Sequence, residues 1–155
     1  MEISELLAPD AVFSQLKAAT KKLVLQELAE KASAHTGIPS RRIFETLNER
    51  ERLGSTGMGQ GIAVPHGHLE GVKKMTGFFA RLAVPVDFEA MDDQPVDLVF
   101  LLLAPEGAGA DHLKGLARVS RVLRNQSLCE KLRAAVDSAA LFSLLTEPTA
   151  SSQAA

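Results

Sequence analysis

The stretch "VDLVFLLLAP", from Val96 to Pro105, decides the class of fold. It is almost entirely apolar and has the length of one strand, which is typical of a central strand covered on both faces. Regions that favour strands also lie at 11–18, 62–64 and 75–88, with helical patterns between and after them. This order predicts a single α/β domain with a mixed β-sheet flanked by helices on both faces.

Residues typical of helix ends mark the helices of this domain. In chain order these signals are Thr20 and Gly37, Pro39 and Gly54, a cap at Asp111, and a Ser127–Glu130 capping-box spacing. A last short helix is expected at 138–145. The side chains expected to face the core from these helices are Leu23, Val24, Leu28, Ala32, Ile43, Phe44, Leu47, Leu113, Leu116, Ala117 and Leu123.

Composition limits the class of function. The chain has 155 residues, a formal net charge of −2 and no long basic run, so we expect no nucleic-acid partner. No apolar run approaches the ~18 residues of a membrane helix, so we expect no membrane insertion. The N-terminus lacks a signal-peptide pattern, and the single cysteine, Cys129, fits a reducing compartment, which together predict a cytoplasmic location. We expect Cys129 to be a packed apolar side chain rather than a nucleophile.

The stretch "GSTGMGQGIAVPHGHLE", from Gly54 to Glu70, contains the first candidate site. Pro65 restricts the residue before it, so the strand at 62–64 is expected to end there and to leave His66 at its end. Strand ends in α/β sheets are where ligands usually bind. Gly67 is expected to give an approaching group room beside the ring. A histidine that only caps the strand through a hydrogen bond remains an alternative.

His112 provides a second candidate group. It directly follows Asp111, in the first turn of a helix, where backbone N–H groups stabilise anions. If both segments share a sheet edge, one imidazole can carry a phosphate while the other donates to it. An exposed His112 without a partner is the alternative. His35 lies near a helix end, where we expect it to meet the last carbonyl groups.

Metal and nucleotide sites are poorly supported. His66 and His68 have an H-x-H spacing, but no cysteine lies nearby and Glu70 or Asp111 would have to complete a zinc site, so no metal is expected. The glycine-rich segment lacks a P-loop lysine and runs from helix to strand, the reverse of a nucleotide-binding order. Its backbone N–H groups and the Ser55 and Thr56 hydroxyls remain candidate donors to an anion. No cofactor is expected.

The sequence resembles the mannitol/fructose-type enzyme IIA family of the phosphoenolpyruvate-dependent phosphotransferase system, and within it the nitrogen-related branch. The motifs that carry the resemblance are "NERERLGSTGMGQGIAVPHG", "FEAMDDQPVDLVFLLLAP" and "HLKGLARVSRVLRN". It implies the mannitol-type IIA fold as one domain over 5–146, followed by a tail at 147–155 that we expect to be disordered.

The resemblance also implies roles for residues of the site. His66 would be phosphorylated by an HPr-like phosphocarrier, with His112 as the second histidine of the site and Arg50 as its arginine. Such a transfer needs positioning and charge stabilisation rather than a metal. Ser55 and Thr56 are expected to add neutral donors. Glu70 is expected to orient a ring or to set partner specificity.

The branch implies a regulator whose phosphorylation state is read by partners such as potassium-uptake or sensor-kinase components. His68 stands where the family pattern suggests a basic residue such as lysine, which leaves its role open. Three other functions stay open at this point: the IIA component of a sugar transporter that passes phosphate to a IIB domain, an interaction module that no longer transfers phosphate, and a zinc-dependent hydrolase.

Overall fold

The computed structural model describes residues 1–147 and contains one mixed sheet of six strands. The strands are β1 (Leu7–Leu16), β2 (Gly57–Gly59), β3 (Ile62–Ala63), β4 (His66–His68), β5 (Thr76–Val86) and β6 (Val96–Ala104). They are ordered β1-β5-β6-β3-β2, and β4 pairs with β6 beyond the end of β3. β6 is antiparallel to β5 and parallel to β3 and β4, so it forms the centre of the sheet.

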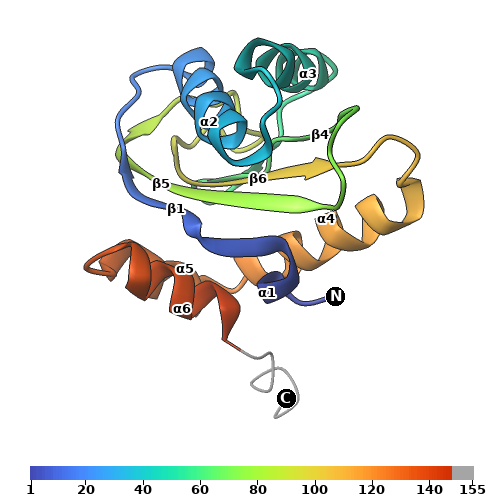
Figure 1. The fold of residues 1–155 in the computed structure, drawn as a ribbon. Helices are drawn as coiled ribbons and strands as arrows, with labels where there is room; N and C mark the ends of the chain where they lie inside the picture. The colour runs from blue at the N-terminus through green and yellow to red at the C-terminus, as the bar shows by residue number, and fades with distance from the viewer. Residues whose placement is uncertain (148–155) are drawn as a thin grey trace.

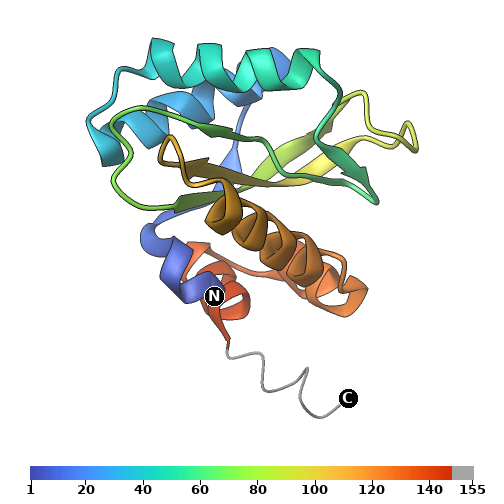
Figure 2. The same ribbon diagram turned by 90° about the vertical axis from the view of Figure 1, so that its right-hand side faces the viewer.

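Among residues 1–147, six helices cover the two faces of this sheet. They are α1 (Ile3–Leu6), α2 (Lys21–Thr36), α3 (Ser40–Arg52), α4 (Gly109–Leu123), α5 (Gln126–Ala134) and α6 (Ser138–Thr146). α2 and α3 lie on one face, and the other four lie on the opposite face (Figures 1 and 2). The predicted α/β domain with helices on both faces of a mixed sheet is therefore confirmed. Of the tail expected to be disordered, 148–155 lie outside the described residues.

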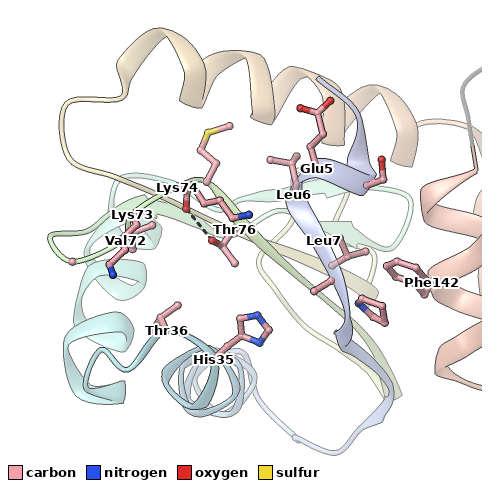
Figure 3. A pocket seen from close by; sticks show the side chains of 15 residues that line it. Glu5, Leu6, Leu7, His35, Thr36, Val72, Lys73, Lys74, Thr76 and Phe142 are labelled. Atoms are coloured by element: carbon pink, nitrogen blue, oxygen red, sulfur yellow. Dashed lines mark hydrogen bonds between the residues drawn. The ribbon is translucent and has the colours of Figure 1, made fainter.

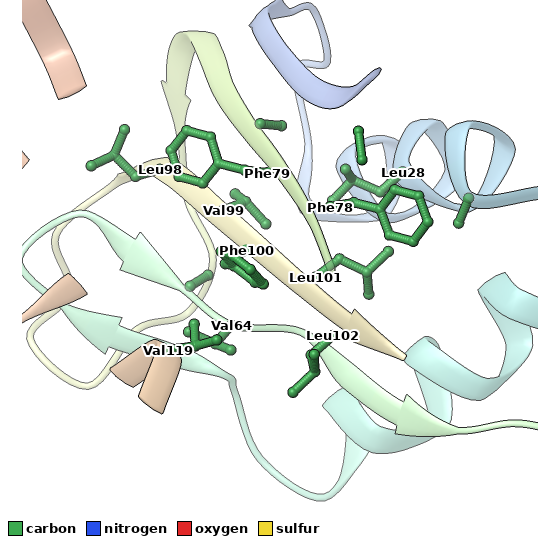
Figure 4. Packing of buried hydrophobic residues seen from close by; sticks show 14 of the residues in the cluster. Leu28, Val64, Phe78, Phe79, Leu98, Val99, Phe100, Leu101, Leu102 and Val119 are labelled. Atoms are coloured by element: carbon green, nitrogen blue, oxygen red, sulfur yellow. The ribbon is translucent and has the colours of Figure 1, made fainter. Parts of the chain in front are cut away.

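The core is built around β6. Every residue from Leu98 to Ala104 is 0% exposed, which confirms a strand buried on both faces. Phe79 of β5 lies opposite Phe100 of β6, and their ring centroids are 6.4 Å apart. Leu28 of α2 and Val119 of α4 approach the sheet from the two helical layers (Figure 4).

Two predicted helix caps are wrong. α4 begins at Gly109, so Asp111 lies within its first turn and does not cap it. An acidic side chain is stabilised by the helix dipole anywhere in the first turn, so its position does not fix the cap. The cap of α5 is Asn125, whose side chain accepts from the backbone N–H of Leu128 at 3.0 Å, rather than Ser127. Thr20 and Gly37 do end α2 as predicted.

The expected core faces are also partly wrong. Leu23 is 44% exposed and Leu113 is 69% exposed, and Ala117 is exposed as well. α4 instead buries the i, i+3, i+7 set that starts at His112 and includes Gly115 and Val119. The buried face of α4 therefore differs from the predicted one, because the prediction relied on the leucines and did not place His112 in the core.

Candidate functional site

His66 begins a strand instead of following the end of one. Pro65 has no N–H to donate, but its carbonyl accepts from the N–H of Leu102 at 3.0 Å. The chain therefore stays beside β6 and continues as β4, in which His66 lies opposite Leu102. The expectation that a strand ends at Pro65 is correct for β3. It misses the parallel pairing of β4 with β6, and this pairing places the half-buried His66 at the edge of the site.

The two ring nitrogens of His66 have different partners. Nδ1 lies 2.8 Å from the carbonyl oxygen of Val64, so this nitrogen carries the proton because a carbonyl can only accept. Nε2 accepts a hydrogen bond of 3.2 Å from Nε of Arg50. Nη1 of Arg50 in turn donates to the carbonyl of Gly54 at 2.9 Å. The nitrogen with a free electron pair therefore faces a fixed positive charge.

His112 completes a group of three imidazoles. Its ring centroid lies 5.4 Å from that of His66 and 4.2 Å from that of His68. His112 is only 5% exposed, while His68 is exposed. Nε2 of His112 is buried, and no group among residues 1–147 is hydrogen-bonded to it. The alternative of an exposed His112 at a helix start is wrong, and the site holds a polar atom without a partner beside His66.

The environment favours neutral imidazoles. Burial lowers the pKa of His66 below its usual value; the charge of Arg50 acts in the same direction, while the hydrogen bond to Val64 opposes the shift. Burial, together with the neighbouring rings of His68 and His66, lowers the pKa of His112 to about 4. Both rings are therefore uncharged near neutral pH, and Nε2 of His66 keeps an electron pair that can form a bond.

The two hydroxyl groups expected to support an anion contact other groups. Ser55 donates to the carbonyl of Phe88 at 2.6 Å and accepts from the N–H of Gly57 at 3.0 Å. The Thr56 hydroxyl donates to the carboxylate of Glu51. The structure therefore places Arg50, His66 and His112 together, but the Ser55 hydroxyl donates to the segment after β5 and the Thr56 hydroxyl donates to the last turn of α3.

Glu70 lies at the surface after β4. Its side chain is exposed, and its backbone carbonyl accepts from Nη2 of Arg42 at 3.3 Å. No contact between the Glu70 carboxylate and His66 is recorded among the described residues, so its expected role in orienting a ring stays a prediction.

Glu51 is a site neighbour that the sequence analysis missed. It is 8% exposed, and its carboxylate accepts from the N–H of Thr56 at 3.1 Å and lies 2.9 Å from Nζ of Lys21. The helical period provides a signal that would have found it. Ile43, Leu47 and Glu51 are four residues apart and are the buried residues of α3, so a carboxylate falls on a core-facing side.

Three glycines of this segment, Gly57, Gly61 and Gly67, are needed because other parts of the chain pack closely against them. A Cβ at Gly67 would lie 2.7 Å from Cγ2 of Thr46 in α3, and one at Gly57 would lie 2.8 Å from Cβ of Ala90. Gly61, with φ +83°, closes the β2–β3 hairpin together with Gln60 at φ 59°. The expectation that Gly67 leaves room for an approaching group is wrong, because α3 fills that space.

The other features considered in the sequence, a metal site, a membrane helix and Cys129, are separate from the His66 site. Within residues 1–147, no three His, Cys, Asp or Glu side chains converge to hold a metal ion, and no helix there is long and apolar enough to cross a bilayer. Cys129 is buried, and burial raises the pKa of its thiol, which confirms the packed apolar role.

His35 lines a separate cavity of about 570 Å³ between β1, the end of α2 and residues 71–76 (Figure 3). Its Nδ1 lies 3.7 Å from Oδ2 of Asp10, a carboxylate of β1 rather than one of the last carbonyl groups of α2. The residues lining this cavity include neither His66 nor His112.

Comparison with known proteins identifies the family. The model of the phosphoenolpyruvate-dependent sugar phosphotransferase system, EIIA 2, matches residues 5–147. The chain belongs to this family. It is 57% identical over 150 residues to a nitrogen regulatory protein of Bradyrhizobium diazoefficiens, and the matched region covers 97% of this chain and 98% of that protein. It is also 36% identical over 148 residues to the nitrogen regulatory protein of Escherichia coli K12, covering 95% of this chain and 91% of that protein.

Solved structures agree with this assignment. The nitrogen regulatory protein IIA-Ntr of Neisseria meningitidis superposes with a TM-score of 0.88 at 36% identity, covering 93% of this chain and 99% of that chain. IIA mannitol of Escherichia coli superposes with a TM-score of 0.74 at 25% identity, covering 89% and 97% of the two chains. The predicted family, its nitrogen-related branch and the mannitol-type IIA fold are therefore confirmed.

Proposed function

We propose that this protein is a regulatory phosphocarrier of the nitrogen-related phosphotransferase system. Nε2 of His66 accepts a phosphoryl group from the phosphohistidine of an HPr-like carrier, and partner proteins read the resulting state. The observation that carries the proposal is the pair of hydrogen bonds on His66, because they leave Nε2 unprotonated and place it against Arg50. The names of two relatives, the nitrogen regulatory proteins of Bradyrhizobium diazoefficiens and Escherichia coli K12, support the regulatory role.

The transfer exchanges one phosphorus–nitrogen bond for another. The electron pair of His66 Nε2 forms the new bond to phosphorus, and the carrier's ring nitrogen keeps the pair of the bond that breaks. The proton on Nδ1 stays in its 2.8 Å hydrogen bond to Val64, which stabilises the positive charge that the ring gains. Chemistry of this type needs alignment and charge stabilisation rather than a new acid or base.

Arg50 and His112 stabilise the transferred group. The guanidinium donates to Nε2 in the free protein and is placed to donate to the phosphoryl oxygens once Nε2 carries phosphorus. His112 is neutral, so one of its nitrogens is a donor, and its buried Nε2 lacks a partner among the described groups. A phosphoryl oxygen would be the missing acceptor.

Phosphorylation changes the surface that a partner meets. It adds a charge of roughly −2 beside the exposed His68, which is enough to switch an interface by repulsion or by pairing with basic residues. Targets such as potassium-uptake or sensor-kinase components, expected for the nitrogen-related branch, would then bind one form in preference to the other.

The first test is intact-mass spectrometry after incubation with phosphoenolpyruvate, enzyme I and an HPr-type carrier. One acid-labile phosphate on the wild type and none on His66→Ala is the expected result. Phosphate on His66→Ala would overturn the site assignment. No phosphate on the wild type, with a donor shown to be active on another acceptor, would overturn the proposed function.

A sugar-transport role is the second candidate. The fructose-specific EIIA component of Haloferax volcanii is 41% identical over 104 residues, covering 67% of this chain and 68% of that protein, which keeps this candidate open. Transfer from the phosphorylated protein to a purified IIB domain, at a rate similar to its own phosphorylation, would favour transport. Absence of that transfer would favour regulation.

A further inference from the structure

A buried carboxylate lies one residue from the arginine of the site. Glu51 is 8% exposed and has three recorded contacts, with the N–H of Thr56 at 3.1 Å, with the Thr56 hydroxyl, and with Nζ of Lys21 at 2.9 Å. A buried charge is costly unless it is paired and hydrogen-bonded, so these contacts are required to keep Glu51 in place. None of them is part of the phosphoryl transfer described above.

These contacts hold the last turn of α3 against the segment that follows it. Arg50 donates to the carbonyl of Gly54 at 2.9 Å, while Glu51 accepts twice from Thr56. Consecutive helical residues project about 100° apart, so Arg50 and Glu51 bind the segment 54–56 from different sides of the helix. Because Nε of Arg50 is hydrogen-bonded to His66, any rotation of this turn moves the guanidinium away from Nε2.

Lys21, at the start of α2, balances the charge of Glu51. It lies 2.9 Å from Glu51, 3.5 Å from Glu89 and 5.1 Å from the ring centroid of Phe88. The charge of Glu51 acts on His66, since it opposes the lowering of the pKa of that ring. Without Lys21, the same negative charge would repel a phosphoryl dianion that arrives at His66.

We propose that Glu51 is a positioning residue for Arg50, and that Lys21 neutralises Glu51 so that the site accepts a dianionic phosphoryl group. Thr56 is the link through which Glu51 holds the end of α3. This inference rests on the proposed phosphocarrier function. It assigns the Thr56 hydroxyl to Glu51 rather than to the phosphoryl group.

The test measures rates of phosphorylation by the HPr-type carrier. Glu51→Gln should slow the transfer by about tenfold, since a small misplacement of a positioning group is costly. Lys21→Met should slow it more, because it leaves the carboxylate unbalanced, and the double variant Lys21→Met/Glu51→Gln should be faster than Lys21→Met alone. In an Arg50→Ala background, Glu51→Gln should cause no further loss. A wild-type rate in Glu51→Gln would overturn the proposal. So would a double variant Arg50→Ala/Glu51→Gln that transfers more slowly than Arg50→Ala by the full factor that Glu51→Gln causes alone.

A spectroscopic measurement separates positioning from folding and does not require phosphoryl transfer. The ¹⁵N chemical shift of His66 Nε2 should change in Glu51→Gln, as its hydrogen bond from Arg50 weakens, while that of Nδ1 stays constant. Glu49→Gln, at an exposed position of the same helix, is the matched control and should change neither shift. If Glu51→Gln fails to fold, Thr56→Val removes the hydroxyl contact alone and should give a smaller shift in the same direction.

The two failures are distinguishable. A wild-type protein that accepts no phosphate would refute the proposed function, while the Nε2 shift would still test whether Glu51 positions Arg50. An unchanged Nε2 shift in a folded Glu51→Gln variant would refute the positioning role, whatever the transfer rates.

Discussion

At the scale of single residues, the burial of His112 couples stability to pH. Its folded pKa is about 4, against a usual value of 6.5, so between these values the unfolded chain binds a proton that the folded protein excludes. Stability is therefore greatest above the unfolded pKa and falls as the pH is lowered toward 4. Lowering the pH from about 7.5 to about 5 should reduce the contribution of His112 to the free energy of unfolding by about 2 kcal/mol, measured by urea denaturation.

A variant isolates this contribution. In His112→Gln the loss of stability between the same two pH values should be smaller by most of that amount, because glutamine does not titrate. His66 also has a lowered pKa and contributes in the same direction, so His66→Ala should remove a separate part of the pH dependence. An unchanged pH dependence of stability in both variants would contradict the conclusion that burial of these two histidines couples stability to pH.

The residues of the site were predictable to different degrees. Specific motifs identified Arg50, His66 and His112, and the structure brings these three together. The partner of the Ser55 hydroxyl was not predictable, because Phe88 lies 33 residues further along the chain and a hydrogen bond over such a distance leaves no local pattern. The partner of the Thr56 hydroxyl, Glu51, lies only 5 residues away and falls on the buried side of α3, which the helical period could have indicated.

At the scale of elements, the packing of α3 on β4 sets the geometry between Arg50 and His66. A Cβ at Gly67 would lie 2.7 Å from Cγ2 of Thr46, so Gly67→Ala must push the helix and the strand apart. Overpacking of this kind should lower the free energy of unfolding by about 1–3 kcal/mol. It should also slow phosphorylation, because it separates the guanidinium from Nε2.

A second substitution makes this prediction specific. Thr46→Ser removes Cγ2 but keeps the hydroxyl that donates to the carbonyl of Arg42 at 3.0 Å. Gly67→Ala/Thr46→Ser should therefore recover much of the stability and the rate that Gly67→Ala loses. If the double variant is as impaired as Gly67→Ala alone, the contact with Thr46 is not the cause.

Elements with a local pattern were predictable, including the two-residue β3, and elements without one were not. β6 and the ends of α2 follow from an apolar run and from the signals at Thr20 and Gly37. β4 has the sequence His-Gly-His and forms only because β6 offers a parallel partner beyond the end of β3. α1, with 4 residues, and β2, with 3, were also missed, since pairing and packing rather than local propensity determine them.

At the scale of the whole molecule, one arginine connects the sheet to the C-terminal helices. Nε of Arg81 in β5 donates to the carbonyl of Ser14 in β1 at 3.0 Å. Its Nη1 donates to the carbonyls of Leu132 at 2.9 Å and of Ala135 at 2.7 Å, at the end of α5. Arg81 thus satisfies the last carbonyl groups of a helix from the strand that lies next to the edge strand β1.

Arg81→Met should destabilise the molecule without disabling its site. The variant leaves these carbonyls without their charged donor, which should lower the free energy of unfolding by about 2–3 kcal/mol in urea denaturation. Amide protons of α5 should exchange faster. The initial rate of phosphorylation should stay at the wild-type level well below the melting temperature, because α3, β4 and α4 supply the side chains around His66.

An exposed arginine provides the comparison. The side chain of Arg41 is 89% exposed, and its recorded ion pair is with Glu45 of the same helix at 3.4 Å. Such a pair contributes less than about 0.5 kcal/mol, so Arg41→Met should leave stability almost unchanged. If the two variants lose equal stability, the effect reflects net charge rather than the carbonyls that Arg81 binds. If Arg81→Met also slows phosphorylation while fully folded, the C-terminal helices act on the site and are not only a scaffold for it.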